Sequence, residues 1–479
     1  MGRKEVYRLK PSNYTDLPES ESIPLSTNDY ATAPNFLQFG LYFSIPDDGD
    51  RANVMNSLKA SLEETLNQCR HLTGTIQSNE NGDYSIVIRN EDTVKFVIHW
   101  LDRSEDGSAN FPSYADLEKS DFASATIGDV TALWLEEIAS GAVSPSPDSN
   151  PLLLGVQANL ISGGLVLVIH YHHWALDFTG FASFVRQWSD NSHALASGTP
   201  APKLDPACLD RSLLNRHSKL AQHERVDAQP IPPAHRGYLA GSLLLFHLTR
   251  SKAEKLKNLA TSEAGPRIST YDAFIALWWR LLSKHRAQTY QADIRRPAVL
   301  FEVINIRNRV TPPLPERYMG NAVLLASSES QTDKLTVKEV IEDASLSKLA
   351  AYIRMITDSV DSAFVYKTLD AIAPARQKNS LFYHLLKSYP PMTLKTTDWR
   401  APNICDADFG LGKPAAFRHL FGKALSLTNI YIYPPRRASA ANEEVFEFAV
   451  PVEKVAVDRF LEDAEVKEWF EFRGVEVKG

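Results

Sequence analysis

The chain has 479 residues, which is more than one ordinary hydrophobic core needs and therefore predicts at least two domains. Hydrophobic residues make up 44% and charged residues 23%, which is typical of a globular protein and argues against extensive disorder. The net charge is −7 and the basic residues are spread thinly, which argues against a nucleic-acid-binding protein.

The first predicted elements are short strands around a helix. Apolar residues at every fourth position over 54–66 predict a helix that buries one face. Alternating apolar residues at 39–43 and at 84–88 predict strands before and after it. This mixture of strands and helices indicates an α/β or α+β architecture.

A hairpin and a helix come next. Residues 156–160 alternate between apolar and polar, and 162–164 read Ser-Gly-Gly, a turn sequence. The apolar run at 165–172 then predicts a return strand that is buried on both faces. Apolar residues at helical spacing over 181–188 predict that a helix follows this strand almost at once.

The composition changes at 200–237, where prolines and polar residues predict a long crossover between two domains. Beyond it, the patterns predict a strand at 243–248, a helix at 271–282 capped by Ser269 or Thr270, a strand at 299–306 and a proline-rich loop at 311–315.

The cysteines and the N-terminus bear on the cellular compartment. Three cysteines fit neither a disulfide framework nor a zinc motif, which predicts a reducing compartment. The N-terminus lacks the apolar stretch of a secretory signal, and the most apolar strand-like run, 165–169, is too short to span a bilayer. We therefore expect a cytoplasmic protein with no membrane segment.

Three histidines and a carboxylate gather at the end of the buried strand: His170, His172, His173 and Asp177. They can be ordinary polar residues, although burying several such groups costs free energy unless they are paired. They can also hold a metal, with His170 and His172 on one strand face and Asp177 as a third ligand. Neither a His-Glu-x-x-His helix nor a Cys-x-x-Cys pair supports that interpretation.

The third interpretation is general-base catalysis. Histidine titrates near neutral pH, so it can accept a proton from a reacting group at physiological pH. A base must also be held in one orientation and one tautomer, and a strand end packed against a helix start provides a rigid mount. In this interpretation Asp177 braces the loop and does not act on the imidazole itself.

Two motifs carry a family resemblance. Residues 172–177 read HHWALD and match the HHxxxD signature of coenzyme A-dependent acyltransferases, which condensation domains and chloramphenicol acetyltransferases also resemble. Residues 408–414 read DFGLGKP and resemble the DFGWG(KP) motif of the BAHD acyltransferases. The DFG tripeptide does not indicate a protein kinase, because no glycine-rich loop, Val-Ala-Ile-Lys strand or His-Arg-Asp loop precedes it.

Further segments extend the resemblance over nearly the whole chain. The similar segments are 210–214 (DRSLL), 269–280, 305–309, 312–315 and Gly320-Asn321. Overall the chain is similar to the fungal branch of the BAHD family, which includes trichothecene 3-O-acetyltransferases. It departs from the family in having Phe178-Thr179-Gly180 after Asp177, where Asp-Gly is common, and Leu411 where plant members have tryptophan.

The resemblance implies a fold and a domain organisation. The expected fold is α/β (mixed α+β), with two similar-sized chloramphenicol-acetyltransferase-like domains, mixed sheets and an active-site channel at the domain interface. Residues 1–199 would form the first domain, 200–237 the crossover linker and 238–479 the second domain. The segment around 400–430 would return to the first domain, and the protein is expected to be a monomer.

The resemblance also implies roles for single residues. His173 would be the general base, and Asp177 a structural brace paired with Arg307. Thr397 and Trp399 resemble an element that approaches the active site, so either is a possible oxyanion donor, with core packing as the alternative for Trp399. Trp174 would line the substrate channel or serve as packing.

The remaining predicted site residues concern the donor and a structural loop. Ser269 and Thr270 fall where the family binds coenzyme A, with a helix cap as the alternative for Ser269, and Lys413 is a further candidate there. The residues of the DFGLG motif would form a structural loop remote from the base: Asp408, Phe409, Gly410 and Gly412.

These features predict an enzyme that transfers an acyl group, most simply acetyl, from acyl-CoA to a hydroxyl or amine of a small secondary metabolite. Acyl-CoA would be a co-substrate, and neither a metal nor a permanently bound cofactor is expected. The alternatives are a condensation-like enzyme with carrier-bound donors and a catalytically silent binding protein on the same scaffold.

Overall fold

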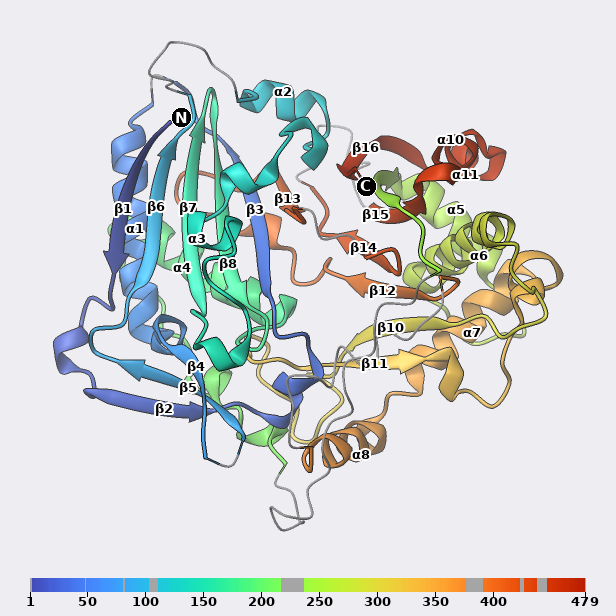
Figure 1. Ribbon diagram of the computed structural model, residues 1–479, viewed down its shortest axis with the longest axis horizontal. Helices are drawn as coiled ribbons and strands as arrows, with labels where there is room; N and C mark the ends of the chain where they lie inside the picture. Colours follow the sequence, from blue (N-terminus) through green and yellow to red (C-terminus); the bar gives the residue numbers. More distant parts are fainter. Residues whose placement is uncertain are drawn as a thin grey trace.

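The structure is a computed structural model, and it describes residues 2–47, 49–80, 82–102, 111–216, 237–375, 391–422, 426–436 and 446–478. In these residues the chain forms two large mixed sheets, one in each half of the molecule, and a small third sheet (Figure 1). This architecture confirms the predicted mixed α/β class with two domains built on mixed sheets.

The first sheet belongs almost entirely to the N-terminal half. Its strands, in spatial order, are β1 (Arg3–Leu9), β6 (Val94–Trp100), β7 (Leu154–Ile161), β8 (Gly164–His172), β3 (Phe36–Ser44) and β13 (Ala416–His419). β6 and β7 run parallel, and the other neighbours are antiparallel. The predicted hairpin is confirmed as β7 and β8, joined at Ser162-Gly163, and Gly163 has a φ of +73° that favours glycine.

Both faces of β8 are covered, as its continuous apolar sequence predicts. On one face, alternate strand residues such as Leu165, Leu167 and Ile169 pack in a core with α1 (Arg51–Gln68) and α4 (Phe178–Ser197). On the other face, Val166 and Val168 pack against residues of α2 (Tyr114–Lys119) and the short helical turns that follow it. The strand end that carries the histidines is therefore held rigidly from both sides.

The second sheet belongs to the C-terminal half. Its strands are, in order, β11 (Val323–Ser327), β10 (Leu300–Asn305), β12 (Leu394–Asp398), β14 (Asn429–Tyr433), β15 (Phe446–Glu453), β9 (Gly241–Leu248) and β16 (Glu471–Val477). The helices α5 (Arg250–Ala260), α6 (Thr270–Tyr290) and α7 (Leu346–Asp358) share its main core. α6 confirms the helix predicted at 271–282 and continues for two more turns.

One strand of the C-terminal half lies in the other sheet. β13 pairs antiparallel with β3, whereas β12 before it and β14 after it lie in the second sheet (Figure 1). The chain therefore crosses between the halves twice within a short segment. Of the crossover predicted at 200–237, residues 217–236 lie outside the described residues, so the domain boundaries stay predictions.

The remaining elements are small. The third sheet contains β2 (Ser20–Pro24), β5 (Tyr84–Arg89) and β4 (Thr75–Ser78), and the further helices are α3 (Glu136–Ala139), α8 (Ser362–Ile372), α10 (Val457–Glu462) and α11 (Ala464–Trp469). Among the described residues, no helix is long and apolar enough to cross a membrane.

Candidate active site

His173 lies in the turn between β8 and α4 and is partly exposed in a cavity between the two halves. Its backbone N–H donates to the carbonyl of Asn35 at 2.9 Å, which ties the turn to the segment before β3. Its ring Nδ1 lies 3.1 Å from the carbonyl of Leu176, so Nδ1 carries the proton and donates this bond. The neutral ring then keeps Nε2 as a proton acceptor.

His170 and His172 point to the other face of the strand. The Nε2 of His170 accepts from the backbone N–H of Leu135 at 3.1 Å, and that of His172 lies 2.9 Å from the carbonyl of Pro145. Burial lowers the pKa of His170 to about 3 and that of His172 to about 4, so both rings are neutral. In the described part of the chain, no group of three or more His, Cys, Asp or Glu side chains is arranged to hold a metal ion.

Asp177 and Arg307 form a buried ion pair across the two halves. The Arg307 Nη1 donates to Asp177 Oδ2 at 2.9 Å, and its Nη2 donates to Oδ1 at 2.8 Å. Asp177 also caps α4 through the N–H of Gly180 at 2.7 Å and accepts from the N–H of Ala322 at 2.8 Å. Burial alone would raise the pKa of Asp177, but the guanidinium and these donors lower it below its ordinary value. Asp177 is therefore a fully engaged carboxylate.

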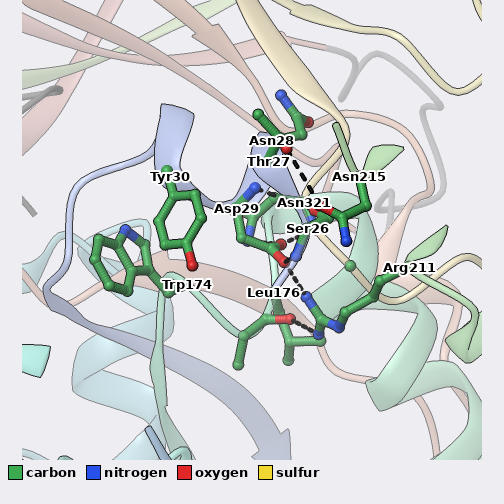
Figure 2. Close-up of polar contacts among 12 residues, drawn as sticks. Ser26, Thr27, Asn28, Asp29, Tyr30, Trp174, Leu176, Arg211, Asn215 and Asn321 are labelled. Carbon is green, nitrogen blue, oxygen red and sulfur yellow. Dashed lines mark hydrogen bonds and ion pairs between the residues drawn. The ribbon is translucent and has the colours of Figure 1, made fainter. Parts of the chain in front are cut away.

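A second buried pair holds the same turn from the other side (Figure 2). Asp29, in the short helix Thr27–Ala31, pairs with Arg211 at 2.7 Å, and Arg211 Nη2 donates to the carbonyl of Ala175 at 2.6 Å. The side-chain amide of Asn321 donates both to Asp29 Oδ1 and to the carbonyl of His173, each at 2.9 Å. Carbonyls on both sides of Trp174 are thus fixed by buried side chains from distant segments.

The cavity that His173 faces has a volume of about 720 Å³. Its walls come from β3, the β8–α4 turn and β13 of the first sheet, and from β10, β11, β12, β14, α6 and α7 of the second half. Burial lowers the pKa of His173 below its ordinary value, while the Leu176 carbonyl and the Asp177 carboxylate raise it. The imidazole is therefore in its neutral, proton-accepting form at pH 7.

Two predicted residues of β12 and its end line this cavity. Thr397 is partly exposed, and in the described structure its hydroxyl has no hydrogen-bond partner. The Trp399 ring stacks on Phe178, with centroids 5.4 Å apart, and within the described residues its Nε1 is likewise without a partner. Lys395, two positions before Thr397 on the same strand, also lines the cavity, and burial lowers its pKa to about 8.

The cavity wall formed by α6 and α7 is polar. Ser269 caps α6, and its hydroxyl accepts from Arg354 at 3.0 Å and donates to Asp272 at 2.8 Å. Thr270 is the first residue of α6 but does not line the cavity, whereas Ser269 does. Arg309, in the loop after β10, also lines the cavity, and among the described residues its Nη1 donates to the carbonyls of Thr357 and Val360.

Two of the predicted binding residues lie elsewhere. Lys413 does not line the cavity, and its ammonium group lies 3.7 Å from Asp406. Trp174 does not line the cavity either. Its indole is fully buried between Tyr30 and Tyr84, and its Nε1 donates to the carbonyl of Thr32 at 3.0 Å, so it is a packing residue.

The DFGLG loop packs on α4 and does not line the cavity. Asp408 accepts from the N–H of Gly410 at 2.9 Å, and the Phe409 ring packs edge-on against Trp188 of α4. Gly410 and Gly412 have φ values of +77° and +108°, which a residue with a side chain rarely adopts. The loop therefore has a structural role: it forms a tight turn between β12 of the second sheet and β13 of the first.

Several residues in the cavity or around the His173 turn were not predicted from the sequence. Lys395 had a usable signal, because residues two apart on a strand share a face and Thr397 was already a candidate. Asn321 and Arg211 lie in segments that resemble the family but received no role. His419, at the end of β13, had no local signal, because its strand joins the sheet of the other half.

Comparison with known proteins identifies the family. The family model described as "Transferase family" matches residues 3–466. Acetyltransferase FGR3 of Gibberella zeae is 37% identical over an alignment that covers 99% of this chain and 95% of that protein. Acyltransferase clz6 of Cochliobolus lunatus is 24% identical over 81% of this chain and 85% of its own length.

Solved structures share the fold. The crystal structure of TRI101 of F. graminearum complexed with ethyl coenzyme A has a TM-score of 0.76 at 18% identity and covers 95% of this chain and 100% of that one. Vinorine synthase has a TM-score of 0.65 at 20% identity, with coverage of 95% and 96%. The chain therefore belongs to the Transferase family and is an acyl-CoA-dependent acyltransferase of the BAHD type.

Proposed function

We propose that this enzyme transfers an acetyl group from acetyl-CoA to a hydroxyl of a small molecule, with His173 as the general base. The observation that carries the proposal is the geometry of His173. Its Nδ1 is held by the Leu176 carbonyl, its backbone is fixed on both sides, and its ring borders a cavity of about 720 Å³ whose walls come from both halves of the molecule.

The reaction needs one proton acceptor and one group that stabilises negative charge. His173 Nε2 takes the proton of the acceptor hydroxyl while its oxygen attacks the thioester carbonyl. The carbonyl oxygen becomes negatively charged, and the free hydroxyl of Thr397 or the indole N–H of Trp399 donates to it. The tetrahedral intermediate then releases the thiolate, which takes the proton from His173. General-base assistance of this kind contributes roughly 100- to 10,000-fold.

Asp177 and Arg307 act through position and not through proton transfer in this proposal. The carboxylate of Asp177 accepts hydrogen bonds from Arg307, Gly180 and Ala322. Because these donors occupy both of its oxygens, we assign it no hydrogen bond to the imidazole of His173. The pair fixes the start of α4 and links it to the second half of the molecule. Ser269 stays a proposed contact for coenzyme A because it lines the cavity. Thr270, the first residue of α6, does not line the cavity and stays a prediction from the family resemblance.

The choice of acetyl and hydroxyl groups has support from relatives. The name of FGR3 says that it is an acetyltransferase, and TRI101 structures are complexed with coenzyme A together with T-2 mycotoxin or deoxynivalenol. Acyl-CoA as a soluble donor distinguishes this proposal from a condensation-like enzyme that takes acyl groups from a carrier. The monomeric state and the cytoplasmic location stay predictions from the sequence.

The proposal is tested by product analysis and by the mass of the protein. The enzyme is incubated with acetyl-CoA and a panel of hydroxylated and amino metabolites, and products are identified by mass spectrometry. We expect an acetylated ester with at least one hydroxylated acceptor, and an unchanged mass of the intact protein after incubation with acetyl-CoA alone. A stable acetyl adduct on the protein that is passed on to the acceptor would contradict direct transfer.

A further inference from the structure

Aromatic rings form one continuous wall of the cavity. Phe39 of β3, Phe178 of α4, Trp399 after β12 and Tyr431 of β14 all line it. Trp399 is in ring contact with each of the other three, with centroid distances of 5.2, 5.4 and 5.1 Å respectively. Rings from both sheets therefore meet in one wall of the cavity that His173 also lines, and an aromatic wall of this kind suits a flat ligand.

His419 is the polar member of this wall. Its imidazole is 7% exposed and lies against Phe39, Trp399 and Phe421. In the described structure neither of its ring nitrogens has a hydrogen-bond partner. Burial lowers the pKa of His419 to about 3, so the ring is neutral and offers one donor and one acceptor. Such a group is costly to bury unless something binds it.

The rest of the cavity has a different character. The wall from α6 and α7 carries Ser269 and Arg354, and Arg309 joins them from the loop after β10. Within the described residues, Arg309 Nη1 donates to the carbonyls of Thr357 and Val360. Guanidinium groups suit the phosphates of the nucleotide donor. An acetyl group fills only a small part of a cavity of about 720 Å³. The aromatic wall is therefore left for the acceptor.

We infer that the acceptor is a flat, aromatic alcohol or phenol with a second hydrogen-bonding group, and that His419 binds this second group. The inference rests on the proposed transfer reaction and deepens it by naming the acceptor class. Phe421 packs edge-on against the imidazole, with ring centroids 3.8 Å apart, and both residues line the cavity. Binding at His419 requires that Phe421 turns aside so that a ligand reaches the nitrogens. His419 is thus a specificity residue and not the base.

The test is a binding titration by calorimetry on the full chain without any donor, with three probes. 2-Naphthol has the flat ring and one hydroxyl, 2,6-naphthalenediol adds a second hydroxyl, and decahydro-2-naphthol lacks the aromatic ring. We expect 2-naphthol to bind roughly 2- to 10-fold more tightly than decahydro-2-naphthol. We expect the diol to bind roughly 2- to 10-fold more tightly than 2-naphthol.

Two variants test whether His419 causes the tighter binding of the diol. In His419→Phe the advantage of the diol over 2-naphthol should disappear while the aromatic preference stays, and His419→Gln, which keeps a donor and an acceptor, should retain part of it. Thermal unfolding checks that both variants fold, and the preferences of the native protein remain a test if they do not. Equal binding of 2-naphthol and its decahydro form, or a diol preference that survives in His419→Phe, would overturn the inference. No reaction occurs in this assay because the donor is absent. If the proposed transfer reaction is wrong, ester formation will be absent in the product analysis while the binding preferences remain.

Discussion

Asn321 holds the backbone carbonyl of His173 with its side-chain amide, at 2.9 Å, although the two residues come from different halves of the molecule. The same amide donates to the buried carboxylate of Asp29. The proposed base is therefore oriented by a contact that exists only when the halves are assembled. This relationship links the stability of the interface to the geometry of the reaction.

Replacing Asn321 with alanine should lower kcat more than it changes KM for acyl-CoA. The change leaves the His173 carbonyl and one Asp29 oxygen with fewer partners, which costs about 1–3 kcal/mol of unfolding free energy. Asn28→Ala is the matched control, because Asn28 is also buried and exchanges two hydrogen bonds with Val323 but does not contact the His173 turn. Equal loss of kcat in both variants would mean that the effect is only structural. The measurement is steady-state kinetics together with chemical unfolding.

Removing one member of the Asp177–Arg307 pair should destabilise the protein and reduce the rate together. Asp177→Ala leaves a buried guanidinium without its carboxylate, which costs roughly 3–5 kcal/mol. Asp190→Ala breaks the surface pair with Arg317 and should cost about 1 kcal/mol or less. Denaturant unfolding of both variants compares them directly. Native stability of Asp177→Ala would refute the bracing role.

The pH dependence of kcat/KM should show an acid limb below the ordinary pKa of histidine. Burial lowers the pKa of His173, so the enzyme keeps a neutral base as the pH falls from 8 toward about 6.5. The rate should therefore be level across this range and fall only at lower pH, as the imidazole becomes protonated. A limb centred above 7 would indicate a different titrating group. The profile is measured with saturating donor and limiting acceptor.

Loss of the oxyanion donor should reduce kcat with little effect on KM. Thr397→Val removes only the hydroxyl at nearly constant volume, and we expect a fall of about 100- to 1,000-fold. Trp399→Phe removes the indole N–H but keeps a ring in the stack with Phe178, so we expect a smaller fall. Rapid kinetics of both variants measures the rate of the transfer step without the Thr397 hydroxyl or without the Trp399 indole N–H. The reverse order of the two effects would assign the oxyanion to Trp399.

Local patterns predicted the elements that lead to the site. The hairpin of β7 and β8 was visible because a glycine turn separates an alternating strand from a continuous apolar one. The start of α6 was predicted from Ser269 or Thr270 as the N-cap, and the structure shows that Ser269 is the cap and forms a capping box with Asp272. Local sequence does not predict that β6 pairs in parallel with β7 or that β13 lies beside β3. Each pairing depends on residues far away in the chain.

Some residues of the site were likewise predicted from local sequence, and others were not. His173, Asp177 and Arg307 were predicted because they lie in motif-like segments, and the structure pairs Asp177 with Arg307 at the end of the turn that carries His173. The pair of Asp29 with Arg211 and the position of His419 were not predicted. Each residue is an ordinary polar residue in its local sequence. Its importance comes from burial and from partners supplied by other segments, which periodicity does not reveal.

The role of His173 as the base of an acyl-CoA-dependent transfer is measured by acceptor-dependent thiol release from acetyl-CoA, compared between the native protein and His173→Ala under identical conditions. We expect release by the native protein that requires the acceptor and falls by roughly 100- to 10,000-fold in the variant, with the fold retained. Acceptor-dependent release that persists at the native rate in His173→Ala would contradict this role.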